Sequence, residues 1–231
     1  MARFSFFGGT PDSMRLDSAV AVIGLGRFGK SLALELMASG VEVLGIDADE
    51  SVVQSLNARL THVVRADAGD EDAMRQLGVP QLRHVVVAIG THLESSILAA
   101  SLLLRLGVPN IWAKADSEAH GTILEQLGVP HVVYPEQEMG RRVAHLVQGK
   151  VQDFVEIEQD YAMVKTRPPR SLLGVRLAEA NVRKRCGVTV IARRRAGLTW
   201  EDVTPDTVLA EEDLVLVTGK TRLVEAFAQM E

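Results

Sequence analysis

Three glycines carry the first chemistry that the sequence offers. The stretch AVAVIGLGRFGKSLALELMASG, from Ala19 to Gly40, places Gly24, Gly26 and Gly29 after an apolar run in the spacing G-x-G-x-x-G. Such glycines let the backbone approach phosphates, and the helix N-terminus behind them supplies free N–H groups. Asp47 ends the next apolar run, where an acidic residue takes ribose hydroxyls in dinucleotide-binding folds. We therefore predict nucleotide binding here, although glycine turns also close helices against strands, and Asp47 also suits a strand-end turn.

Arg27 is the unusual residue in this loop. It stands in the first turn of the predicted helix, where the positive end of the helix dipole disfavours a cation. Its planar guanidinium is suited to clamping a phosphate, and a clamp there suits ATP or ADP at least as well as a dinucleotide. Phe28 lies in the same turn and is included in the predicted site. A solvent-facing side chain without a ligand is the alternative for Arg27.

Two further strand ends extend the candidate site. Asp67 ends the third apolar run, and Ala88 and Gly90 belong to the segment AIG that ends the fourth. Ligands of doubly wound sheets lie beyond the carboxyl ends of the strands. These positions are therefore expected to line the region of the base and the ribose, with ordinary loop chemistry as the alternative.

The elements that must position these residues alternate along the first 148 residues. The apolar runs are AVAVIGL, VEVLGID, THVVRAD, HVVVAIG, NIWAKA and HVVYP, and helical patterns start near Arg27, Glu50, Asp70, His92, Ser117 and Pro135. Short apolar strands separated by helices predict right-handed βαβ units and a parallel sheet buried on both faces. Six such strands predict a Rossmann-like, doubly wound α/β fold.

The pattern changes near Gly149. The remaining residues form short strand-like runs, VQDFVEIE, YAMVKTR, GVTVIARRR and DLVLVTG, with small helices expected at LAEANVRKR and KTRLVEAFAQ. We expect a flexible tail over residues 1–18, a nucleotide-binding domain over 19–149 that ends in a helix from Pro135, and a small α+β domain over 150–231.

Composition excludes several function classes. The net charge of −5 gives no general attraction to nucleic acid, and the single cysteine, Cys186, permits no disulfide within the chain. The longest apolar runs fall short of the roughly 18 residues that span a bilayer, so a cytoplasmic protein is expected. The six histidines show no metal-ligand spacing, and the residues after Gly149 include no histidine. A dehydrogenase needs an acid or base beside its cofactor, and none is evident, so we do not expect an enzyme.

The motifs VIGLGRFGKSLALEL, VVVAIG, PNIWAKA and PEQEMGRRVA, in this order, resemble a known family. They look like the KtrA/TrkA-type RCK proteins (regulators of potassium conductance), the cytosolic regulatory subunits of bacterial potassium-uptake systems. The resemblance covers Ala19 to Glu231. It implies an octameric ring built from dimers and docked on the inner face of a potassium-translocating membrane subunit of the KtrB/TrkH type. It also implies that ATP and ADP compete for the nucleotide site and favour different ring shapes.

The resemblance assigns roles to individual positions. The glycines would cradle phosphate, Asp47 would hold the ribose, and Arg27 would reach a terminal phosphate, including that of a neighbouring subunit's nucleotide. Glu136 matches an acidic residue that helps to bind a cation such as Mg²⁺, Ca²⁺ or Na⁺ at the dimer interface. An acid favourable to a helix start is the simpler explanation of Glu136.

Members of this family also bind cyclic di-AMP between paired C-terminal subdomains. Asn181 and Arg183 stand where such contacts are expected, and the segment RRRAG, from Arg193 to Gly197, is expected at a solvated hairpin tip. Two other functions stay open. An NAD(H)-dependent oxidoreductase would need catalytic residues, and a redox-sensing nucleotide-binding repressor would need a recognition helix and a basic face.

Overall fold

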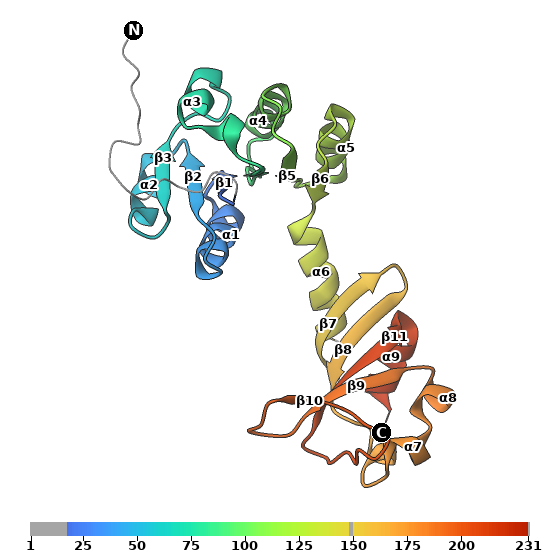
Figure 1. Cartoon of the computed structure of the whole chain (residues 1–231). Helices are drawn as coiled ribbons and strands as arrows, with labels where there is room; N and C mark the ends of the chain where they lie inside the picture. The colour runs from blue at the N-terminus through green and yellow to red at the C-terminus, as the bar shows by residue number, and fades with distance from the viewer. Residues whose placement is uncertain (1–17, 148–149, 231) are drawn as a thin grey trace. The chain divides into compact units, whose positions relative to one another are not determined.

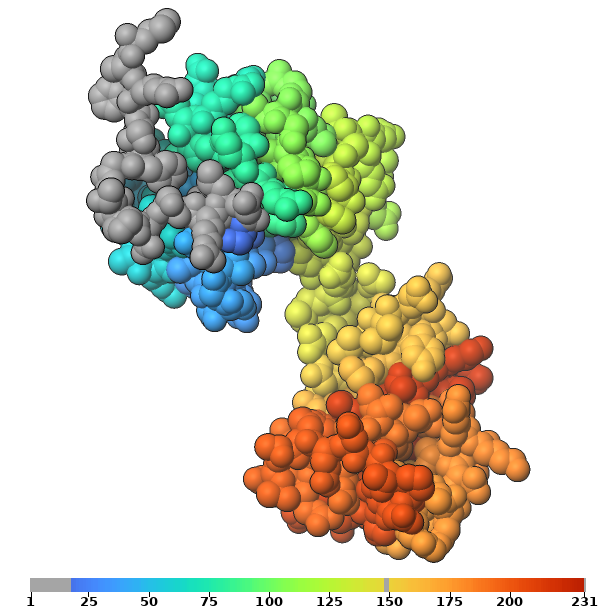
Figure 2. Space-filling view, in the orientation of Figure 1, coloured from blue at the N-terminus to red at the C-terminus, as the bar shows by residue number. Residues whose placement is uncertain are grey.

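A computed structural model describes residues 18–147 and 150–230 of the 231-residue chain. By contacts the chain divides into two compact units, Met1–Pro135 and Glu136–Glu231. In Figures 1 and 2 the first unit runs from blue to yellow-green and the second from yellow-green to red. The expected tail over residues 1–18 lies outside the described residues, apart from Ser18.

The first unit is built on six parallel strands that follow the six apolar runs. They are β1 (Val20–Ile23), β2 (Val43–Asp47), β3 (His62–Arg65), β4 (His84–Val87), β5 (Asn110–Lys114) and β6 (His131–Val133). Their order in the sheet is β3-β2-β1-β4-β5-β6. The order reverses between β2 and β4 around the central strand β1, so the predicted doubly wound Rossmann-like fold is confirmed.

Five helices cover this sheet. They are α1 (Arg27–Ala38), α2 (Glu50–Leu56), α3 (Glu71–Gln76), α4 (Leu93–Arg105) and α5 (Glu118–Leu127), with a short 3₁₀ turn, η1, at Val79–Gln81. The helix starts fall where the sequence predicts them, and at three of the five a side-chain cap fixes the start. The carboxylates of Asp49 and Asp70 accept backbone N–H bonds at the starts of α2 and α3, and the hydroxyl of Ser117 does so at α5.

The core lies on both faces of the parallel sheet. Side chains of β1 alternate between the faces. Ala21 belongs to the core cluster that also contains Met74, Ala99 and Leu124 of α3, α4 and α5. Val22 points the other way, into a cluster with residues of α1 and α2. Burial on both faces explains why these strands read as continuous apolar runs rather than as alternating ones.

The second unit starts with α6 (Pro135–Leu146) and holds a small antiparallel sheet (Figure 1). Its strands are β7 (Val151–Glu158), β8 (Tyr161–Thr166), β9 (Thr189–Arg194), β10 (Trp200–Asp202) and β11 (Leu214–Lys220), in the order β10-β9-β11-β8-β7. The helices are α7 (Leu177–Ala180), α8 (Val182–Cys186) and α9 (Thr221–Gln229), with a 3₁₀ turn, η2, at Arg170–Leu172. This arrangement confirms the predicted small α+β domain.

Three details of the second unit differ from the expectation. Strand β10 was not expected; it pairs with β9 across the hairpin that contains Gly197. The single helix expected at LAEANVRKR is two helices, because Asn181 adopts φ 48° and ends α7. Helix α6 belongs by contacts to the second unit, where Arg142 Nη2 lies 2.6 Å from Asp153 Oδ1, so the compact units divide before the expected boundary near Gly149.

No helix in residues 18–147 and 150–230 is long and apolar enough to cross a membrane.

Candidate functional site

A cavity of about 280 Å³ opens at the carboxyl ends of β1, β2, β3 and β4. Six residues that the sequence singled out line it together: Gly24, Gly26, Asp47, Asp67, Ala88 and Gly90. Arg27, Phe28 and Gly29 are not among its lining residues. The cavity therefore lies where the sheet order reverses, the usual place for a ligand in this architecture.

The three glycines serve different purposes. Gly24 has φ +88°, and a Cβ there would lie 2.9 Å from Ile89 Cγ1. A Cβ on Gly29 would lie 1.9 Å from the carbonyl oxygen of Gly24, so this glycine is needed for close packing of α1 against the loop. A Cβ on Gly26 would meet nothing within 4 Å. The open space over Gly26 is the part of the loop that a phosphate group can approach.

No side-chain cap closes the start of α1 within the described part of the chain. Gly26 is the N-cap residue without a side-chain cap, and the first turn contains no acidic residue. The first N–H groups of a helix have no partner within the helix, so they are available to an anion. Phe28 packs against the apolar cluster under α1, away from this opening. Arg27 is exposed and forms no ion pair with the part of the chain that the structure describes.

Asp47 fastens the glycine loop to the end of β2. Its Oδ2 atom accepts a hydrogen bond of 2.6 Å from the N–H of Leu25, and its Oδ1 atom accepts one of 2.9 Å from the N–H of Asp49. Each carboxylate oxygen can accept a further bond, because an ionised carboxylate has about four acceptor positions. Asp47 therefore positions the loop while retaining capacity for ribose hydroxyls.

The carboxylates of Asp49 and Asp67 line the cavity on the same side as Asp47. Asp67 Oδ1 accepts the N–H of Gly69 at 2.8 Å, two residues beyond the end of β3. Hydrogen bonds from the hydroxyl and amide of Ser51 lower the pKa of Asp49 below its usual value. Asp47, Asp49 and Asp67 line the cavity, and no Lys or Arg does. This side suits the hydroxyl and amino groups of a ligand and disfavours a phosphate on the ribose.

The site predicted from the sequence does not include Thr91, His92 or Ser95, yet all three line the cavity beyond β4. Their position after a strand end is the signal that could have identified them. A second missed feature lies under Gly90, where a Cβ would be 2.8 Å from Asp116 Oδ1. Lys114 Nζ lies 3.0 Å from that oxygen, so a half-buried ion pair supports the wall of the cavity.

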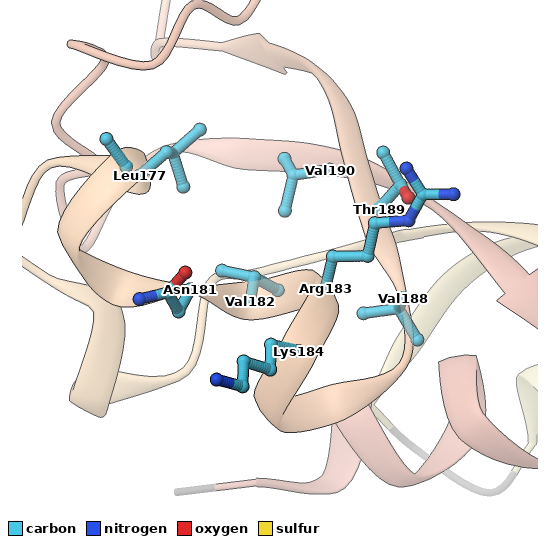
Figure 3. Close-up of a pocket in the computed structure, with 9 residues that line it drawn as sticks. Leu177, Asn181, Val182, Arg183, Lys184, Val188, Thr189 and Val190 are labelled. Atoms are coloured by element: carbon cyan, nitrogen blue, oxygen red, sulfur yellow. The ribbon is translucent and has the colours of Figure 1, made fainter.

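A separate pocket in the second unit brings together Asn181 and Arg183. It measures about 430 Å³ and is lined by residues of α7, α8 and β9. Figure 3 shows Asn181 and Arg183 on the helical side, with Val188, Thr189 and Val190 on the strand side. Arg183 and Lys184 are its only charged lining residues, and both are cationic.

Glu136 is exposed in the first turn of α6. Within residues 18–147 and 150–230, no group of three or more His, Cys, Asp or Glu side chains could hold a metal ion. A cation at Glu136 would need further ligands, such as those of a second copy.

The hairpin expected at RRRAG is present, but Arg193 does not lie at a solvated tip. Its Nε atom is 2.6 Å from Glu201 Oε1, and its Nη1 atom donates to the carbonyl oxygen of Val208 at 2.7 Å.

The chain is similar to potassium uptake proteins over nearly its whole length. The TrkA-N domain family matches residues 20–135. The Ktr system potassium uptake protein C of Bacillus subtilis (strain 168) is 34% identical over 90% of this chain and 94% of its own. The Ktr system potassium uptake protein A of Vibrio alginolyticus is 31% identical over 88% of this chain and 93% of its own.

A solved structure, the GsuK channel bound to NAD, has a similar fold. It is 15% identical, with a TM-score of 0.64, over 92% of this chain. The chain spans 39% of the length of that solved chain.

Proposed function

Since the chain belongs to the TrkA-N family and, within it, to the KtrA/TrkA-type RCK proteins, we propose that it is a nucleotide-sensing regulatory subunit of a potassium transport system. The observation that carries the proposal is the cavity at the strand ends, where the open space over Gly26 faces the first N–H groups of α1. The similar proteins of Bacillus subtilis and Vibrio alginolyticus are named potassium uptake proteins, and these names support potassium transport as the process that the site regulates.

The nucleotide that we propose is ATP or ADP. The β-phosphate would lie over Gly26 and the start of α1, with the ribose against Asp47 and the base near Asp67, Ala88 and Gly90. Arg27, exposed at the mouth of the same helix, would take the terminal phosphate that distinguishes ATP from ADP. NAD(H) is the second candidate, because the similar GsuK channel is bound to NAD in its solved structure. The carboxylates on the ribose side disfavour a 2′-phosphate and so NADP(H).

Binding would act as a signal rather than as a step of catalysis. A ligand shifts a conformational equilibrium only by the difference in its affinity for the two states. Arg27 can supply that difference, because only ATP presents a third phosphate to it. The chain would act on a potassium-translocating membrane subunit of the KtrB/TrkH type, from the cytoplasmic side, as dimers assembled into a ring. An NAD(H)-dependent oxidoreductase and a redox-sensing repressor are the alternatives.

Two further ligands belong to this proposal. A cation such as Mg²⁺, Ca²⁺ or Na⁺ would bind at Glu136 between paired chains. The pocket of Asn181 and Arg183 favours a second, anionic regulator, for which cyclic di-AMP is the candidate. Its cationic lining and its volume suit a ligand with phosphates and flat bases.

Calorimetric titration of the full chain with ATP, ADP, NAD, NADH and cyclic di-AMP tests the proposal. ATP and ADP should bind more tightly than NADH, and cyclic di-AMP should bind without competing with them. Tight NADH binding together with weak ATP binding would instead support the oxidoreductase. If none of these nucleotides binds, the proposal that the chain senses a nucleotide is contradicted.

A further inference from the structure

The second unit contains a cationic pocket that the nucleotide-sensing function does not use. It measures about 580 Å³ and is lined by residues beside the start of β7, after β8 and at the end of α9. Its lining residues are Lys150, Gln152, Thr166, Arg167, Pro168, Pro169, Arg170, Ala228 and Met230. None of these lines the pocket of Asn181 and Arg183.

The charge of this pocket is unbalanced. Among its described lining residues, Lys150, Arg167 and Arg170 are cationic and none is a carboxylate. Neither arginine forms an ion pair or a side-chain hydrogen bond with any described residue, and both are exposed. Three cations around one hollow repel one another, and an anion in the hollow would remove that cost.

The walls of the pocket are fixed by the fold. Pro168 and Pro169 are buried and separate the two arginines with a stretch of restricted φ. Thr166 Oγ1 donates to the carbonyl oxygen of Lys150 at 3.0 Å, which ties the end of β8 to the start of β7. Lys150 Nζ donates to the carbonyl oxygen of Gln229 at 2.9 Å, which ties this wall to the end of α9. The arginines therefore project from a rigid base.

The cationic surface continues into a neighbouring hollow. A second cavity of about 390 Å³ shares Gln152 and Arg167 with the first and adds Arg194 and Glu212. The guanidinium of Arg194 lies 5.3 Å from the ring centroid of Trp200, which holds that side chain in place. Together the two hollows are lined by four cationic residues and one carboxylate.

We propose that this pocket, the Arg167–Arg170 pocket, binds a phosphate-bearing anion of small-molecule size. Guanidinium groups present paired donors that match phosphate oxygens, and the hollow has the volume of a small-molecule site rather than the flatness of a protein interface. The ligand comes either from solution, as a phosphorylated metabolite, or from a membrane, as an anionic phospholipid headgroup. Binding there would give the chain a second input, independent of the cavity at Gly26.

The test compares the full chain with its Arg167→Gln/Arg170→Gln variant. Calorimetry with inorganic pyrophosphate at low salt represents the soluble source. Co-sedimentation with phosphatidylglycerol vesicles, against phosphatidylcholine vesicles, represents the lipid source. Arg222→Gln, an exposed arginine of α9 outside both hollows, is the matched control, and Arg27→Ala controls for pyrophosphate bound in the first unit.

The double variant should lose about tenfold or more in affinity in one of the two assays, because each charge-assisted contact is worth about that factor. The Arg222→Gln and Arg27→Ala variants should each still bind pyrophosphate or phosphatidylglycerol at the Arg167–Arg170 pocket. Loss confined to pyrophosphate identifies a soluble ligand, and loss confined to phosphatidylglycerol identifies a lipid headgroup. Equal binding by wild type and the double variant in both assays, with equal thermal unfolding, would overturn the proposal.

Discussion

The N–H of Leu25 donates to Asp47 Oδ2 at 2.6 Å, so the carboxylate at the end of β2 holds the loop between β1 and α1. The same carboxylate is the group proposed to bind ribose. The shape of the loop between β1 and α1 and the proposed recognition of the ribose therefore depend on the same side chain. A change at this position should affect every ribonucleotide, whatever its number of phosphates.

Asp47→Ala should weaken ATP and ADP together, by about ten- to a hundredfold, because it removes charge-assisted bonds common to both. Calorimetry with ATP and 2′-deoxy-ATP separates the ribose contact from the shape of the loop. If Asp47 binds the 2′-hydroxyl, wild type should discriminate between the two and the variant should not. Discrimination that persists in the variant would assign Asp47 to the loop alone.

Gly26→Ala and Gly29→Ala form a matched pair. Alanine at position 26 has open space and an ordinary φ of −62°, so it should change stability by less than about 0.5 kcal/mol. It should nevertheless weaken nucleotide binding, because its methyl group occupies the approach to the helix N-terminus. Alanine at position 29 meets the carbonyl oxygen of Gly24 and should destabilise the fold by about 1–3 kcal/mol. Thermal unfolding with and without ATP measures both effects, and equal behaviour of the two variants would contradict this division of roles.

Arg27→Ala should spare the fold and damage the ATP response. The side chain is exposed and has no ion pair within residues 18–147 and 150–230, so thermal unfolding without ligand should not change. ATP affinity should fall by about ten- to a hundredfold and ADP affinity by less. Arg59→Ala, another exposed arginine of the first unit, is the control. An Arg27→Ala variant that still prefers ATP over ADP as strongly as wild type does would contradict the proposed contact between Arg27 and the terminal phosphate.

The sequence was sufficient to predict the parallel sheet, its helix starts and six of the residues that line the cavity. Its apolar runs are short and unbroken, and Asp49, Asp70 and Ser117 are local caps whose effect does not depend on distant contacts. Gly24 and Asp47 belong to a motif of fixed spacing. Predictions of this kind succeed because each signal lies within a few residues of the structure that it determines.

Two features could not be predicted in this way. They are the ion pair of Lys114 with Asp116 and the contacts of Arg193. Lys114 reads as the polar end of a strand, and only the fold brings its pair with Asp116 beneath Gly90. Arg193 lies in a run of three arginines, which is typical of a solvated tip, yet its partners come from β10 and from the loop before β11. Lys114 and Asp116 are only two residues apart, but their place beneath Gly90 depends on the pairing of β4 with β5. The partners of Arg193 lie eight or more residues away and leave no local pattern.

Asp213→Asn should destabilise the second unit strongly. Asp213 is fully buried, accepts the N–H of Ala210 at 2.9 Å and lies within 4 Å of Arg193 and Arg195. Asparagine removes the charge that faces both arginines and weakens the bond from the N–H of Ala210, while Arg193 keeps Glu201, so the cost should be about 1–3 kcal/mol. Glu201→Gln, which removes an exposed partner of Arg193, should cost less than about 1 kcal/mol. Chemical unfolding of both variants measures the difference, and similar losses would show that burial of Asp213 is unimportant.

His120 should make the first unit less stable in mild acid. The side chain is 2% exposed, its Nε2 atom has no hydrogen-bond partner among the described residues, and its Nδ1 atom accepts the N–H of Asp116. Burial lowers the pKa of His120 below its usual 6.5, and the charge of Lys114 lowers it further, against an opposing effect of Asp116. The unfolded chain therefore takes up this proton at a higher pH than the folded chain does.

The free energy of unfolding should consequently be highest above pH 6.5 and fall as the pH drops from 6.5 toward the lowered pKa of His120. One such proton gives a slope of at most about 1.4 kcal/mol per pH unit. His120→Gln removes the titrating group and should flatten this part of the profile, whatever it does to absolute stability. His84→Gln, at the exposed first residue of β4 in the same unit, should leave the slope unchanged. Urea unfolding at several values between about pH 5 and 7 measures the slopes, and a His120 variant as pH-dependent as wild type would place the acid sensitivity in another group.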